Sequence, residues 1–139
     1  MKFAVQLVAY GEDGQEETRQ EVVVLEKEYQ RVEQLGLTLA EAKQLLKELQ
    51  HQVLEQQTTA YLAARSHCQA CGLALPVKEQ TTRTLRTLFG TVVLASPRLY
   101  HCRCRIHTRT TFRPLTTLLS EPTTPELLFL EAKWASLIS

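Results

Sequence analysis

The chain has no run of eighteen or more apolar residues, which is the length that a membrane-spanning helix requires. It begins Met-Lys-Phe-Ala with no apolar signal segment, so we expect a protein of the reducing cytoplasm with no membrane partner. With 139 residues, of which 44% are apolar and 22% charged, the composition is typical of a single globular domain.

Motifs of several enzyme classes are also missing. The sequence contains no glycine-rich phosphate loop and no His-Glu-x-x-His metalloprotease motif. Its carboxylates crowd into the first 57 residues, where they fit a solvated surface better than a site that holds two metal ions. We therefore expect no enzyme activity from this chain.

The chain has four cysteines, and they form two close pairs. Cys68 and Cys71 belong to a Cys-x-x-Cys-Gly turn, in which Gly72 permits the positive φ that aims two thiolates at one point. Cys102 and Cys104 follow about thirty residues later. Four thiolates in two pairs suit a closed, structural Zn²⁺ site with no open position for water. The sequence therefore predicts one Zn²⁺ that folds a domain rather than catalysing a reaction.

Other interpretations of these cysteines stay open. Two disulfides would require an oxidising compartment, and Cys102 and Cys104 are too close in sequence for an easy mutual bridge. A redox Cys-x-x-Cys would leave the second pair without a role. His107 is the alternative ligand, because the spacing Cys102-x-Cys104-x-x-His107 would let it replace one cysteine.

The charge is divided along the chain, although the formal net charge is only +1. Residues 1–57 carry six basic against eleven acidic residues, whereas residues 58–120 carry nine basic residues against Glu79 alone. A zinc ion with four thiolates would add a charge of −2 to residues 58–120, whose net charge would still be strongly positive. This asymmetry predicts a polyanionic partner, with a solvated basic face as the alternative. The candidate DNA-binding residues are Arg83, Arg86, Arg98, Arg103, Arg105 and Arg109.

The first half of the chain predicts a β-hairpin followed by one long helix. In residues 2–10 apolar and polar side chains alternate, residues 18–26 contain a continuous apolar run, and a turn with two glycines separates the two segments. Thr38 and Glu41 form a capping box, which predicts the start of a helix over 38–65. Apolar residues at heptad spacing, interrupted by Gln56, line one side of this helix. Either the chain's own hairpin and terminal helix cover this seam, or it joins two copies in a homodimer with Gln56 setting the register.

The second half predicts a zinc ribbon and a terminal helix. Residues 81–88 and 91–95 favour a small antiparallel sheet with a cysteine knuckle at each side. Residues 111–120 are predicted to form an irregular segment. Thr124 and Pro125 open a helix that is apolar nearly all round, so it requires a larger core or an interface. The predicted fold is α+β, divided into residues 1–66, the ribbon 67–116 and a final segment 117–139.

Linked phrases of this sequence resemble the amino-terminal region of ISKra-type bacterial insertion-sequence transposases. They are 35–43, Cys68-x-x-Cys71-Gly72, 86–92, 96–104 and 124–137, and they span almost the whole chain. The resemblance implies a DNA-binding and assembly region for duplex transposon ends, which in such proteins precedes an integrase-type catalytic domain that these residues do not contain. The run 73–77 departs from the pattern, because it lacks the expected basic residues. The alternative function is a zinc-stabilised protein-interaction module that does not bind DNA.

Overall fold

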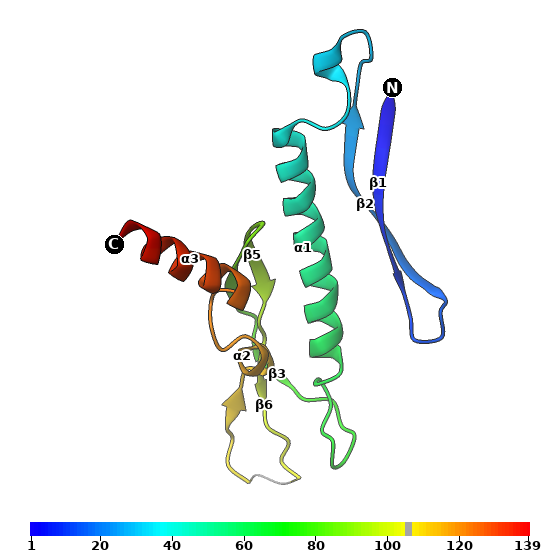
Figure 1. Cartoon of the computed structure of the whole chain (residues 1–139). Coiled ribbons are helices and arrows are strands. Elements are labelled where there is room, and N and C mark those ends of the chain that lie inside the picture. The colour runs from blue at the N-terminus through cyan, green and yellow to red at the C-terminus, as the bar shows by residue number, and fades with distance from the viewer. Residues whose placement is uncertain (105–106) are drawn as a thin grey trace. The chain divides into compact units, whose positions relative to one another are not determined.

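A computed structural model describes residues 1–104 and 107–139 (Figure 1). It shows the predicted α+β fold: an N-terminal hairpin, a long helix, small antiparallel sheets and a C-terminal helix. The chain forms two compact units, Met1–Val53 and Leu54–Ser139. This boundary lies inside the long helix, and the division into 1–66, 67–116 and 117–139 stays a prediction.

In the first unit, β1 (Lys2–Tyr10) and β2 (Glu16–Glu26) form the predicted antiparallel hairpin. Gly14 supplies the positive φ of the connecting turn, at 76°. An isolated two-stranded ribbon is marginal in water, so the hairpin needs contacts with other elements. Lys27 Nζ lies 2.8 Å from Glu41 Oε1 of the helix, and Val22 is the buried apolar residue of β2.

The long helix α1 (Leu39–Ala63) follows a short 3₁₀ turn, η1 (Val32–Gln34). Its capping box is confirmed: the Thr38 amide donates to Glu41 Oε2 at 2.8 Å, and the Glu41 amide donates to Thr38 Oγ1 at 3.2 Å. The seam is only partly covered within the described residues, since Leu39 is 73% exposed whereas Ala42 and Leu49 are half-buried. Pairing of two copies along α1 stays a prediction.

The core of the second unit lies between a hairpin and two helices. Strands β4 (Thr82–Thr87) and β5 (Gly90–Ala95) pair so that Leu85 faces Val92, and both side chains are buried. Helix α2 (Pro114–Leu118) adds Leu115, which is fully buried. Leu54, Tyr61 and Leu62 from the end of α1 pack against this cluster, as does Leu119. The last turns of α1 therefore belong to the ribbon's own core.

A second, three-stranded sheet carries the cysteine knuckles. It consists of β3 (Val77–Glu79), β6 (Arg98–Tyr100) and β7 (Thr111–Phe112), in the order β3-β6-β7. The segments 81–88 and 91–95 form the predicted antiparallel hairpin, but the expectation that this sheet carries a knuckle at each side was wrong, because the hairpin is a sheet of its own. The expectation of an irregular 111–120 segment was also wrong, since β7 and α2 lie there. Both errors concern pairings that local sequence does not determine.

The C-terminal helix α3 (Pro125–Ile138) begins where predicted, with Thr124 as its N-cap and Pro125 in the first turn. The amide of Arg86 donates to Pro122 O at 2.8 Å, and the amide of Thr124 donates to Arg86 O at 2.9 Å. Beyond this anchor the helix exposes large apolar side chains, including Trp134 at 56% and Leu137 at 76%. Among residues 1–104 and 107–139, no helix is both long and apolar enough to cross a membrane.

Candidate metal centre and the basic face beside it

The first knuckle is a tight turn closed by backbone hydrogen bonds. The amide of Gly72 donates to Cys68 O, and the amide of Cys68 donates to Leu73 O, each at 2.8 Å. Gly72 has φ of 73°, the left-handed conformation that its position in the motif predicted. The turn therefore folds from local sequence, and it sets Cys68 and Cys71 on one side of the loop.

The second knuckle is held against the first by the β3-β6-β7 sheet. The amide of Tyr100, at the end of β6, donates to Pro76 O at 2.9 Å, and the amide of His101 donates to Thr110 O at 3.0 Å. These bonds tie the segment before Cys102 both to the chain that leaves the first knuckle and to the approach to β7. Residues about thirty positions apart in the sequence thus reach one place.

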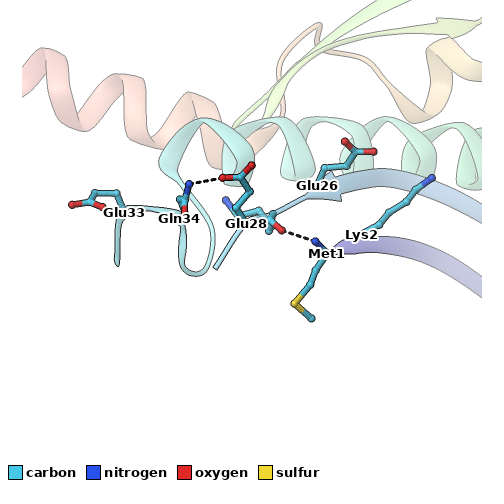
Figure 2. Close-up of a pocket in the computed structure, with 7 residues that line it drawn as sticks. Met1, Lys2, Glu26, Glu28, Glu33 and Gln34 are labelled. Carbon is cyan, nitrogen blue, oxygen red and sulfur yellow. Dashed lines mark hydrogen bonds between the residues drawn. The ribbon is translucent and has the colours of Figure 1, made fainter. Parts of the chain in front are cut away.

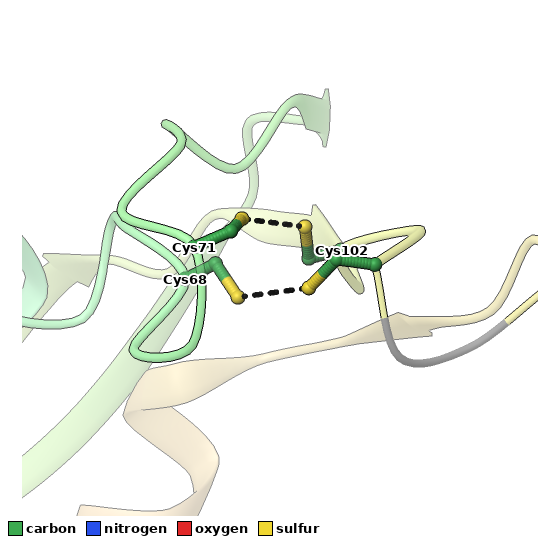
Figure 3. A group of neighbouring side chains, drawn as sticks. Cys68, Cys71 and Cys102 are labelled. Atoms are coloured by element: carbon green, nitrogen blue, oxygen red, sulfur yellow. Dashed lines mark hydrogen bonds between the residues drawn. The ribbon is translucent and has the colours of Figure 1, made fainter.

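The four Sγ atoms converge on one point (Figure 3). They all lie within 4.8 Å of one another; the Sγ atoms of Cys68 and Cys104 are 3.5 Å apart, and those of Cys71 and Cys102 are 3.4 Å apart. A disulfide would need about 2.05 Å, whereas thiolates at about 2.3 Å around a tetrahedral ion lie about 3.8 Å apart. The spacing of the four sulfurs therefore suits a group that could hold one metal ion better than it suits two disulfides.

His107, the alternative ligand, lies outside this cluster. It is an exposed residue of the described chain, and the group close enough to share an ion consists of the four cysteines. The donor set is therefore all sulfur and supplies four ligands, with none of them an oxygen or nitrogen. Such a set saturates a tetrahedral ion, so the geometry suits a structural role.

The protonation of the thiols differs strongly around the site. The amides of Cys71 and Ala70, which point at the Cys68 sulfur, lower the pKa of that thiol to about 6. Hydrogen bonding with Cys102 and then Cys68 raises the pKa of Cys104 to about 12. For Cys71 the Leu73 amide lowers the pKa, but interactions with Cys102 and Cys68 together with burial outweigh it and raise the pKa. Negative charge thus collects at Cys68 first and opposes further ionisation.

Three of the six predicted DNA-binding arginines form hydrogen bonds or ion pairs with groups of their own chain. Arg86 forms an ion pair with Glu131 of α3. Arg98 donates to Thr111 Oγ1 at 2.8 Å and lies 3.4 Å from Glu79. Arg83 donates to Ser120 O at 3.2 Å. These contacts give all three arginines a structural role that the charge pattern alone could not reveal.

The other predicted arginines lie near the cysteines or outside the described residues. Arg103 is exposed, and the Arg109 guanidinium carbon lies 4.5 Å above the centre of the Tyr100 ring. Both line a hollow of about 360 Å³ together with Cys71, Cys102 and Cys104, and none of the described residues that line it is acidic. Arg105 lies outside the described residues.

A second hollow, of about 300 Å³, borders the knuckles and shares Leu75, His101 and Cys102 with the first; the sequence analysis missed it. It is lined by Cys68 and Cys102 together with Arg65, the rings of Tyr61 and Phe112, two histidines and further residues, and none of these described residues is acidic. The Arg65 guanidinium carbon lies 3.5 Å from the centre of the Tyr61 ring. The signal in the sequence was this pair of residues, four positions apart on a predicted helix.

The unit formed by residues 1–53 has a larger hollow, of about 690 Å³, lined by acidic and basic residues and by Met1 (Figure 2). Several of its polar groups bind one another: the terminal amine donates to Lys27 O at 2.7 Å, and Gln34 Nε2 donates to Glu28 Oε2 at 2.8 Å. Lys27 is also paired with Glu41. The site therefore lacks a convergent set of free ligands or nucleophiles, and we assign it no function.

The chain matches no family model, and comparisons with curated proteins and with solved structures found no match either. These comparisons give no support to the resemblance to ISKra-type transposases, which stays a prediction.

Proposed function

We propose that this chain is a zinc-stabilised DNA-binding module. The observation that carries the proposal is the acid-free hollow in which Arg103 and Arg109 lie beside Cys71, Cys102 and Cys104. A metal held by these cysteines would fix the backbone on both sides of Arg103. The basic groups would then be presented to phosphate on a rigid surface rather than on a mobile loop.

Zinc is the ion that the donor set favours. Four thiolates in a tetrahedron select Zn²⁺ or an iron–sulfur cluster among the common metals of proteins. Sγ atoms 3.4 and 3.5 Å apart leave room for a single ion at their centre. When bound, the ion would supply folding free energy, because the ribbon has a small apolar core.

The charge of the module supports a polyanion as the partner. Residues 58–120 contain nine basic residues and one acid, and a zinc ion with four thiolates would offset only two of the eight net positive charges. Glu79 pairs with Arg98 and with Arg113, at 3.4 and 3.2 Å. Within the described chain no ion pair involves Arg65, Arg103 or Arg109, so these three are the strongest candidates for phosphate contacts.

The resemblance to ISKra-type transposases supports a more specific form of this proposal. In that form the module binds duplex transposon ends and helps to assemble them, and the catalytic acids would lie in a different domain. The isolated module would then cleave no DNA with Mg²⁺ or Mn²⁺, which a plasmid-nicking assay can test.

The decisive experiment measures binding of a labelled DNA duplex by fluorescence anisotropy at several salt concentrations. We expect the paired change Arg103→Gln and Arg109→Gln to reduce the log–log salt slope by about two. The paired change Lys43→Gln and Lys47→Gln removes the same charge from α1 and should leave the slope unchanged. Binding without salt dependence, or equal effects of the two pairs, would contradict the proposal.

A protein-interaction module is the second candidate, and α3 provides the observation that favours it. Phe129, Trp134 and Leu137 are 65%, 56% and 76% exposed, a large apolar area for a free surface. If this candidate is right and the first is wrong, the chain will bind a protein through α3 and bind duplex DNA no better than its unit of residues 1–53 would.

A further inference from the structure

The second hollow, of about 300 Å³, combines aromatic rings with one cation. Tyr61, His67, His101 and Phe112 contribute rings to its wall; His67 is exposed, and the other three are half-buried, so the fold holds those rings while part of each stays accessible. His101 and Phe112 stack with their ring centres 4.6 Å apart and their planes 25° apart. The wall therefore offers preorganised aromatic surface rather than flexible aliphatic chains.

The polar groups of this hollow are suited to an anionic or acceptor-rich ligand. The Arg65 guanidinium carbon lies 3.5 Å from the centre of the Tyr61 ring, and Arg65 Nη1 donates to Tyr61 O at 3.2 Å, which leaves other N–H groups of the guanidinium for a ligand. His67 Nδ1 lies 3.0 Å from Ser66 Oγ, and His101 Nδ1 lies 2.9 Å from Thr110 Oγ1. These hydroxyl contacts engage the Nδ1 atoms and leave Nε2 as the second polar atom of each ring.

From this combination we infer that the hollow receives one unpaired nucleotide of a bound DNA, with its base on the aromatic wall and its phosphate at Arg65. This inference rests on the proposed DNA-binding function. Stacking of a base on aromatic rings or on an arginine plane is the usual way in which proteins hold unpaired nucleotides. A volume of about 300 Å³ lies at the lower end of ligand pockets, which suits one base rather than a longer segment.

The chemistry of the hollow favours a nucleotide over an apolar side chain of a partner protein. Arg65 is the cationic side chain among the described residues of the lining, none of which is a carboxylate, and the Cys68 thiolate beside it would be engaged by a bound metal. A purely apolar occupant would leave the Arg65 face and the histidine nitrogens without partners, whereas a nucleotide supplies both a π surface and acceptor oxygens. The metal ligands Cys68 and Cys102 at the edge of the hollow would hold its shape.

The test uses hairpin duplexes with one identical stem. The first is blunt, the second carries one unpaired 2-aminopurine deoxynucleotide at its 5′ end, and the third carries an abasic residue there. We expect the 2-aminopurine duplex to bind about tenfold more tightly than the other two, and its fluorescence to fall as the base stacks. Equal affinity of the abasic and 2-aminopurine duplexes would overturn the inference, because the base would then contribute nothing.

Two variants connect the effect to the hollow. Arg65→Gln, at an exposed position, should remove most of the preference for the unpaired base, and Phe112→Leu should restore the fluorescence while it keeps apolar volume. Arg109→Gln, in the neighbouring hollow, is the matched control and should weaken all three duplexes equally. Metal content reports whether each variant is folded; if Phe112→Leu loses the metal, Arg65→Gln alone decides. Equal weakening of the three duplexes by Arg65→Gln would overturn the inference.

The same measurements separate this inference from the proposed function. If the blunt duplex binds with salt dependence but the unpaired base adds nothing, only the inference about the hollow fails. If none of the duplexes binds, both fail. Free dAMP distinguishes a nucleotide site from a DNA site: weaker binding of dAMP than of the overhang duplex supports the inference, and equally tight binding overturns it.

Discussion

Three cysteines of the knuckles differ in thiol pKa: that of Cys68 is lowered by two backbone N–H groups, whereas those of Cys71 and Cys104 are raised. The amides of Cys71 and Ala70 lower the pKa of Cys68 to about 6, whereas the thiol neighbours raise the pKa of Cys104 to about 12. In a metal-free site, the Cys68 thiolate thus accepts hydrogen bonds from neighbouring thiols that keep their protons. A divalent ion must displace the remaining protons before it can use all four sulfurs.

Zinc binding at pH 7.5 should therefore release at least two protons, those of Cys71 and Cys104, whose pKa values are raised. Since Cys68 has a pKa of about 6, its thiol is already ionised at that pH and releases almost none. Affinity should fall as pH is lowered, because protons then compete with the metal for each sulfur. Calorimetry in buffers of different ionisation enthalpy measures the number of protons released, and a value near zero would contradict the arrangement.

Replacing a single ligand should release the metal. We expect protein purified without chelator to contain one zinc per chain, and Cys71→Ser to lose it while keeping most of the helical circular dichroism. The helix signal should persist because α1 begins at Leu39, well before the first knuckle. His107→Ala is the control and should keep its zinc. Loss of zinc from His107→Ala but not from Cys104→Ser would show that the ligand set is wrong.

Among the elements, the short helix α2 has a larger role than its five residues suggest. It places Leu115 between the β4–β5 hairpin and the last turns of α1, where Leu85 and Leu94 surround it. Tyr61 donates from its hydroxyl to Pro114 O at 3.4 Å, so the same helix also borders the hollow that Arg65 lines. Packing around α2 thus couples the core of this unit to its candidate binding surface.

Leu115→Ala should lower the free energy of unfolding of the ribbon by about 2 to 5 kcal/mol, because it leaves a cavity at a fully buried position. Leu118→Ala, in the same helix, is the matched control and should have little effect, since Leu118 is 50% exposed. Guanidinium titrations of the zinc-loaded protein measure both changes. Similar losses for the two variants would argue against this placement of α2.

At the scale of the whole molecule, charge and exposed apolar surface are distributed unevenly. Residues 1–57 are acidic and residues 58–120 are basic, so a polyanion would be attracted to one region and repelled by the other. Exposed apolar residues lie on α3 and along part of the α1 seam, at Trp134, Leu137 and Leu39. These surfaces offer two routes by which copies of the chain, or another protein, can associate.

The single tryptophan distinguishes the two routes. At 56% exposure, Trp134 should show the red-shifted fluorescence of a hydrated indole, and association through the α1 seam should leave that spectrum unchanged. Sedimentation equilibrium over the same range of concentrations reports whether copies associate at all. A blue shift of the Trp134 emission as the protein concentration rises would instead indicate association through α3. In that case Leu137→Glu would abolish the shift and Leu39→Glu would leave it unchanged.

Local sequence by itself determined the elements whose signals are short-range. The Thr38–Glu41 capping box, the two N-terminal strands, the positive φ of Gly72 and the start of α3 at Pro125 were all predicted, because each depends on residues within a few positions of one another. The cysteine spacing likewise predicted two knuckles with sulfurs close enough to share an ion.

Only the tertiary structure decided which distant groups meet. The knuckles are joined by β3-β6-β7 rather than by the 82–95 hairpin, because strand pairing depends on partners far along the chain. For the same reason the arginines, equivalent in composition, separate into Arg86 and Arg98, which pair with Glu131 and Glu79, and Arg103 and Arg109, which line a hollow without acids. Charge is a property of sequence, but the partner that neutralises it is selected by packing.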